Sequence, residues 1–278
     1  MAERPVDPAQ LDAGRMPFFE HLRELRDRLR NAVLCFLGGF AIAYAFNQQI
    51  YAWILRPLIN VMYAMKAADP SLPDPTINFG SPTEPFWVYL SVSLWAGIFI
   101  SSPLIFYQLW KFIAPGLYQH ERRIGVVFAA VSGVFFAGGA LFCYYLVLEQ
   151  MLGFLLSYAT SNLGEVSGPF DLVYDTGQAI AVRPLIGMRD YLDLARGMML
   201  GFGLVFELPL LIYFLAAAGL VTHRGLWKFN RYWIVIAFVI GAILTPGPDI
   251  GSQIAMSLPL VVLYEISIGI AWVVTRRK

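Results

Sequence analysis

The sequence predicts an all-α, polytopic membrane protein with six transmembrane helices and both termini on the cytoplasmic side. Hydrophobic residues make up 58% of the 278-residue chain and charged residues only 14%, whereas a soluble domain usually carries about 25% charged residues. The apolar residues fall in long blocks, which is typical of helices that cross a bilayer. The basic residues gather in alternate connections between these blocks, and this asymmetry predicts the direction of insertion.

The spans follow from the lengths of the apolar blocks. A helix needs about 20 mostly apolar residues to cross about 30 Å of hydrocarbon. The predicted spans are about 31–55, 86–107, 125–148, 197–219, 232–244 and 254–274. The fifth is short, because its 13 residues reach only about 20 Å as a helix. Pro246, Gly247 and Pro248 favour a tight reversal before the last span, so we expect the last two spans to form a short hairpin.

The positions of Lys and Arg predict which side each connection occupies. Fifteen of the 20 lie in the N-terminal segment, the loops after the second and fourth spans, and the C-terminal tail. Basic loops stay in the cytoplasm, so segments 1–30 and 276–278 are predicted to be cytoplasmic, with a membrane domain at 31–275 between them. The opposite loops, about 56–85 and 149–196, are rich in Pro, Gly and Asp. We expect these two loops to form caps that contain short helices.

The motifs of several enzyme classes are absent from the sequence. There is no Walker A pattern and no His-Glu-x-x-His, and the three histidines lie outside the predicted spans. These absences count against a P-loop ATPase, a zinc protease and a haem or copper protein with ligands inside the bilayer. We therefore predict that the chain is not an enzyme, with no catalytic residues, no metal, no cofactor and no nucleic-acid partner.

Two cytoplasmic segments carry candidate binding residues. Residues 18–29 form a predicted amphipathic helix, since Leu22, Leu25 and Leu29 share one face. The simpler interpretation is an interfacial helix in which Glu24 pairs with Arg28 at i, i+4. The loop 110–123 places an aromatic–Pro–Gly turn beside a carboxylate, and its simpler interpretation is a well-packed turn.

Polar residues near or inside the last three spans are the other candidates. Glu207 lies in the middle of a predicted span, where an ionisable side chain costs about 2.5–3.5 kcal/mol and indicates a function by default. The alternative is a protonated Glu bonded to a neighbouring helix. Asp249 and Gln253 are at i, i+4 at the start of the last span, and Asp249 is equally explained as an N-terminal helix cap.

Taken together, these segments resemble the TatC family, the core membrane component of the twin-arginine protein export system. The resemblance covers about residues 18–275 and rests on many motifs in one order. They are His21-Leu22-x-Glu24-Leu25-Arg26-x-Arg28-Leu29, Pro57-Leu58, Ser81-Pro82-Thr83-Glu84-Pro85-Phe86, Ser102-Pro103, Tyr107-Gln108-x-Trp110-x-Phe112-Ile113-Ala114-Pro115-Gly116-Leu117-Tyr118, His120-Glu121-Arg122-Arg123, Phe206-Glu207-x-Pro209, Leu244-Thr245-Pro246-x-Pro248-Asp249 and Ser252-Gln253.

The resemblance implies a receptor for signal peptides that bear two adjacent arginines. Glu24 and Glu121 would be the carboxylates that meet them, since a guanidinium fork can engage a carboxylate through two hydrogen bonds. The implied frame of this site is Arg26, Arg28, Phe112, Pro115, Leu117 and Tyr118. The implied outside cap contains Pro57, Pro82, Glu84 and Pro85.

The resemblance also implies partners and an energy source. Glu207 would face a concave cavity and, with Asp249 and Gln253, contact single-span TatA-type and TatB-type proteins. Membrane lipids and further copies of this chain are the other implied partners, and the proton-motive force is the implied driving force. The alternative is a proton-coupled secondary transporter that uses Glu207, but inverted repeats, which that class predicts, are not apparent in the sequence.

Overall fold

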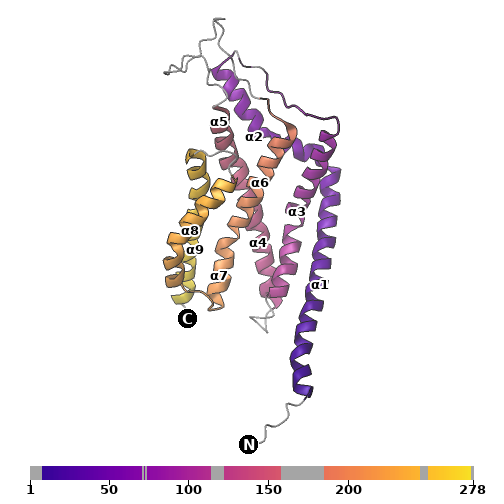
Figure 1. Ribbon diagram of the computed structural model, residues 1–278, viewed down its shortest axis with the longest axis vertical. Helices are drawn as coiled ribbons and strands as arrows, with labels where there is room; N and C mark the ends of the chain where they lie inside the picture. Colours follow the sequence, from indigo (N-terminus) through magenta and orange to yellow (C-terminus); the bar gives the residue numbers. More distant parts are fainter. Residues whose placement is uncertain are drawn as a thin grey trace, which may run out of the picture.

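The long apolar blocks form helices that lie side by side along one axis in the computed structural model (Figure 1). It describes residues 8–70, 72, 74–113, 122–157, 185–244 and 250–276. The helices are α1 (Pro8–Ala45), α2 (Asn47–Ala68), α3 (Glu84–Ile113), α4 (Arg122–Phe142), α5 (Leu148–Ser157), α6 (Met188–Phe206), α7 (Leu208–Ala217), α8 (His223–Leu244) and α9 (Ile250–Arg276). A π-helical turn joins α4 to α5, and the only β-type contact in the described residues is one isolated bridge between Asn78 and Gly187.

The described residues contain five or six helical stretches that can cross a membrane. Five are long and apolar enough: Glu84–Phe112, Val126–Ser157, Met188–Ala217, His223–Ile243 and Met256–Arg276. Helices α1 and α2 meet the same criterion only as a pair, bent by 78°. The predicted all-α, multi-pass class is therefore confirmed.

Three helix boundaries differ from those expected from the apolar blocks. The stretch 31–55 is divided at Phe46, because the polar run 47–49 ends the first apolar block and α2 starts there in a new direction. Helix α6 starts at Met188 rather than near Gly197, so Arg196 lies inside it. Helix α8 has 22 residues rather than 13, because its basic first turns are also helical.

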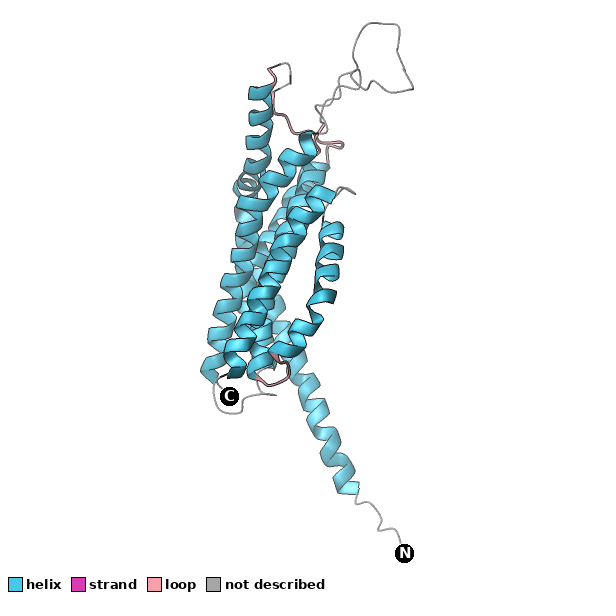
Figure 2. Ribbon diagram, turned by 90° about the vertical axis from the view of Figure 1, so that its left-hand side faces the viewer, coloured by secondary structure: helices cyan, strands magenta, loops and turns pink. Residues whose placement is uncertain are grey.

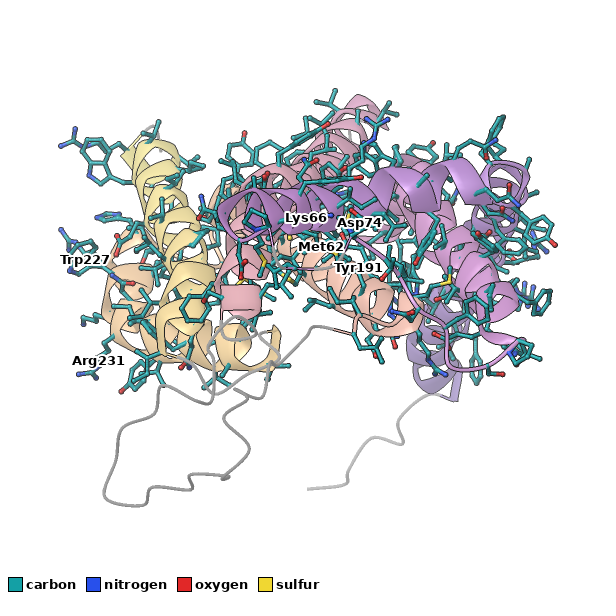
Figure 3. All side chains as sticks on the ribbon, turned by 90° about the horizontal axis from the view of Figure 1, so that it is seen from above. Met62, Lys66, Asp74, Tyr191, Trp227 and Arg231 are labelled. Atoms are coloured by element: carbon teal, nitrogen blue, oxygen red, sulfur yellow. The ribbon has the colours of Figure 1, made fainter. Side chains whose placement is uncertain are left out.

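Helix α2 lies across one end of the bundle, above α4, α5 and α6 (Figures 1 and 3). Pro57, inside α2, has no N–H to pair with the carbonyl of Trp53 four residues earlier. The Tyr144 hydroxyl donates to that carbonyl at 2.7 Å, and the hydroxyl of Tyr191, labelled in Figure 3, donates to the next carbonyl, that of Ile54, at 2.6 Å. The missing helical hydrogen bond at Pro57 thus lies where the two tyrosine hydroxyls attach α2 to the bundle.

We expect Tyr144→Phe to lower the free energy of unfolding by about 1–3 kcal/mol, because the Trp53 carbonyl would be buried without a donor. In a Pro57→Ala background the new N–H of residue 57 can pair with that carbonyl, so the same substitution should cost less. Unfolding of the purified protein in detergent would measure this double-mutant cycle. Tyr145→Phe is the matched control, since Tyr145 is largely exposed. If Tyr144→Phe lowered the unfolding free energy equally in both backgrounds, the Tyr144 hydroxyl would not be substituting for the N–H that Pro57 lacks.

Helix α1 packs along α3 through a close approach of the two backbones. A Cβ atom on Gly39 would lie 2.7 Å from the carbonyl oxygen of Gly97, and one on Gly97 would lie 2.9 Å from the backbone of Phe40. Only glycine permits this separation. The contact fixes α1 against the bundle, while the first turns of α1 extend beyond the other helices (Figures 1 and 2).

Candidate functional site

Glu24 lies on α1 near the end of α3 and is paired with Arg28. Arg28 Nη2 donates to Glu24 Oε1 at 3.0 Å, and the Arg28 and Glu24 side chains are 22% and 33% exposed. The i, i+4 pair expected from the sequence is therefore present. Arg28 Nε is buried and has no partner in the described residues. Arg26 points elsewhere, is largely exposed and contacts Asp27 at 3.4 Å.

Phe112, the other described member of the predicted site, joins the end of α3 to α1. Its ring stacks on His21 with a centroid separation of 4.5 Å. His21, Glu24 and Arg28 are at i, i+3 and i+7, so they share one helix face. The structure therefore brings Glu24, Arg28 and Phe112 to one region. Pro115, Leu117, Tyr118 and Glu121 lie outside the described residues.

Glu207 occupies the junction between α6 and α7, where Pro209 prevents a continuous helix. The Ser132 hydroxyl and the backbone of Phe136, both in α4, lie next to its carboxyl group. One carboxyl oxygen, Oε1, is buried with no partner among the described residues. Ser132 also accepts from Trp110 Nε1 at 2.8 Å. A chain of polar contacts thus runs from Glu207 to the last turn of α3.

Two glycines hold Glu207 against α4. A Cβ atom on Gly203 would lie 2.8 Å from the ring of Phe136, and one on Gly139 would lie 2.5 Å from the carbonyl oxygen of Phe202. Helices α4 and α6 therefore meet at backbone distance, one turn before Glu207. This close approach lets the short Ser132 side chain reach the Glu207 carboxyl group.

The polar residues of the α8–α9 hairpin largely bond to one another. Gln253 Nε2 donates to the carbonyl of Phe238 at 3.0 Å, so its amide joins α9 to α8. Glu265, which interrupts the last predicted span, accepts from Asn230. Asn230 is not among the residues predicted from the sequence, although its polar side chain in the preceding helix was the available signal. Asp249 lies outside the described residues.

Glu84 links the starts of two helices at the end of the bundle that carries α2. Its Oε2 accepts from the backbone N–H of Gly80 at 2.6 Å, and its Oε1 accepts from the N–H of Arg189, in the first turn of α6, at 3.2 Å. A carboxylate at a helix N-terminus is favourable because free N–H groups point at it. Pro85 is the second residue of α3 and Pro82 precedes the helix, positions where no N–H is required.

The arrangement offers carboxylates, arginines and aromatic rings at one end and a buried carboxyl group at mid-bundle. Across the described residues, no group of three or more His, Cys, Asp or Glu side chains is placed to hold a metal ion. The carboxylates and arginines can form ion pairs and hydrogen bonds with a partner.

The sequence model of one family, described as Sec-independent protein translocase protein (TatC), matches residues 20–259. The chain belongs to the TatC family. The TatC protein of Koribacter versatilis is 37% identical over 266 residues, covering 95% of this chain and 89% of that protein. The TatC protein of Aquifex aeolicus is 37% identical over 263 residues, covering 95% and 98%.

Solved TatC structures agree with the fold. A crystal structure of a twin-arginine translocase receptor, TatC, matches with a TM-score of 0.72 at 36% identity, covering 92% of this chain and all of the other. The family predicted from the sequence motifs is thereby confirmed. As in other TatC proteins, the apolar helices make this chain a multi-pass membrane protein.

Proposed function

We propose that this TatC protein is the receptor for twin-arginine signal peptides and the core of a Sec-independent translocase that exports folded proteins across the cytoplasmic membrane. The observation that carries the proposal is the match, over nearly the whole chain, to a twin-arginine translocase receptor. The names of the curated relatives support the translocase activity. No catalytic step is needed, since a receptor works by recognition.

Recognition rests on Glu24 and Glu121 in this proposal. Each carboxylate accepts from one guanidinium of the arginine pair. At an effective dielectric of about 20, opposite charges about 4 Å apart attract by about 4 kcal/mol before the cost of desolvation is subtracted. Arg28 occupies one oxygen of Glu24, so the incoming arginine shares or displaces it. The partial exposure of Glu24 leaves room for this exchange.

Chain connectivity supports placing both carboxylates at one end of the bundle. Phe112 contacts His21 on α1, and Glu121 directly precedes Arg122, the first residue of α4. The chain from Phe112 to Glu121 spans at most about 30 Å even when fully extended. Trp110, near the end of α3, lies against Phe128, in the first half of α4, so the end of α3 is beside the beginning of α4.

We infer that this end faces the cytoplasm of a bacterial inner membrane. The start of α1 and the end of α9 lie at the same end of the molecule (Figures 1 and 2). Basic residues of α1 and Arg276, at the end of α9, fall there too, as the rule for cytoplasmic loops requires. Helix α2 and the Glu84 cap then lie on the outside.

The exposed surface of α8 is the docking site we propose for single-span TatA-type and TatB-type partners. Only 17% of the apolar stretch within His223–Ile243 is buried inside the chain, against 50% of the one within Met188–Ala217. Trp227 and Arg231, on α8, point away from the bundle (Figure 3). Glu207, Asp249 and Gln253 are proposed partner contacts, with the proton-motive force as the energy source.

Crosslinking of a signal peptide to membranes that contain the complex tests the proposal. A photoreactive residue is placed at Glu20 or Gln119, which precede Glu24 and Glu121 in the sequence, or at Phe79 on the outside as a control. We expect a twin-arginine peptide to crosslink at the first two positions and not at the third, and a twin-lysine peptide to crosslink much less, because lysine lacks the guanidinium fork. Equal crosslinking of both peptides would reject the receptor assignment.

A further inference from the structure

An apolar cavity of about 330 Å³ lies between α2, α3, α4 and α6. Its walls include Trp53, Trp95, Phe99 and Ala140, and among the described residues Arg196 is the one charged residue that lines it. Neither Glu207 nor any described residue of the signal-peptide site contributes to it. An apolar space of this kind does not hold water, but it accepts apolar ligands.

Arg196 is held in one orientation at the wall of this cavity. Its Nη1 donates to Ser91 Oγ at 3.1 Å, and its Nη2 lies 3.1 Å from Asp193 Oδ1. The guanidinium carbon lies 5.2 Å from the ring centroid of Trp95, in the range of a cation–π contact. The side chain remains 34% exposed. An arginine fixed in this way loses little conformational entropy when it binds a further anion.

Arg196 shares the Asp193 carboxylate with a second arginine. Arg189 and Arg196 both contact Asp193, at 3.7 and 3.1 Å, so one carboxylate serves two guanidinium groups. The Asp190 carboxyl group lies toward Gly187 at the start of α6. Because Arg196 is about 12 Å along the helix from Met188, its long side chain can reach the level at which phospholipid headgroups lie.

We propose that this cavity binds one acyl chain of a phospholipid whose phosphate pairs with Arg196. The walls of the cavity come from membrane-spanning helices and α2, so the surrounding lipid is its natural source of apolar ligands. The apolar lining takes the chain, and the remaining donors of the Arg196 guanidinium take the phosphate oxygens. The bound lipid would fill the space beneath α2 and so support the outside cap.

This site is separate from the proposed signal-peptide site. The contact between Gly39 of α1 and Gly97 of α3 gives a common reference point. Ser91, the partner of Arg196, lies before Gly97 on α3. Glu24 lies before Gly39 on α1. Since α1 and α3 run in opposite directions, Ser91 and Glu24 lie about 30 Å apart along the bundle. Loss of lipid binding and loss of signal-peptide binding are therefore distinguishable.

Native mass spectrometry of the full-length protein in detergent tests the proposal with two added lipids, dioleoyl phosphatidylglycerol and dioleoylglycerol. The two share their acyl chains, and only the first has a phosphate. We expect the phospholipid to be retained at least tenfold better, and Arg196→Gln to remove that preference. Arg189→Gln is the matched control, because Arg189 contacts the same carboxylate but does not line the cavity. Ala96→Phe, which fills the cavity, should weaken retention of both lipids.

Arg196→Lys keeps the charge and should show intermediate retention, which gives a second measurement if Arg196→Gln unfolds. Unchanged phospholipid retention in Arg196→Gln would overturn the phosphate contact. Equal retention of the two lipids by the unsubstituted protein would overturn it as well. Retention that persists in Ala96→Phe would show that the lipid binds elsewhere and would overturn the cavity assignment.

Discussion

Replacing Glu24 and Glu121 together by Gln is expected to abolish binding of a twin-arginine signal peptide while the helix bundle stays folded. A hydrogen bond to a charged group contributes about 1.5–3 kcal/mol, so loss of both contacts should raise the peptide Kd by about 100-fold or more. Glutamine keeps the size of each side chain, so only the charges change. Fluorescence anisotropy with a labelled peptide and the detergent-purified protein would measure the Kd.

The same substitutions should change stability little. The Glu24–Arg28 pair is an i, i+4 ion pair at a partly exposed position, and such pairs contribute only a few tenths of a kcal/mol. Glu20→Gln is the matched control, since Glu20 is an exposed acid one turn earlier on α1. If the Kd of the double variant for the peptide were within about twofold of that of the unsubstituted protein, the two carboxylates would not be the groups that bind the arginine pair.

The all-α class could be predicted because a bilayer leaves few alternatives. Backbone groups in hydrocarbon must be paired within the protein, so long apolar blocks are helices. The bend at Phe46 could not be predicted in the same way. Apolar residues resume at Ile50, and their continuity favours one span through residue 55. In the structure those residues face the bundle as part of α2, where Tyr51 and Leu58 are buried.

Local contacts at the candidate site could also be predicted from the sequence, whereas long-range contacts could not. The Glu24–Arg28 pair follows from i, i+4 spacing alone. Ser132 meets Trp110 across 22 residues, and Asn230 meets Glu265 across 35. No periodicity relates such residues, since the contacts depend on which helices pack together and at what register. Arg196 had no assigned role for the same reason: its partner Ser91 is 105 residues away.

Gly39→Val is expected to separate α1 from α3, whereas Gly38→Val is expected to have little effect. A Cβ on Gly39 would lie 2.7 Å from the carbonyl oxygen of Gly97 and 3.1 Å from Ser101 Cβ. A backbone carbonyl cannot rotate away as a side chain can, so the helices themselves must move. The cost should reach or exceed the upper end of the range of about 1–3 kcal/mol for overpacking. A Cβ on Gly38 meets no atom within 4 Å.

This pair of variants also tests how α1 is positioned for recognition. Movement of α1 at Gly39 would shift Glu24 relative to the end of α3, because His21 and Phe112 are in contact there. We therefore expect Gly39→Val to lower both the unfolding free energy in detergent and the crosslinking yield between cysteines introduced at positions 21 and 112. Gly38→Val should preserve both quantities, since its side chain would lie in open space. If the two variants behave alike, the glycine contact does not hold α1 in place, and Glu24 must be positioned by its contacts near the receptor end alone.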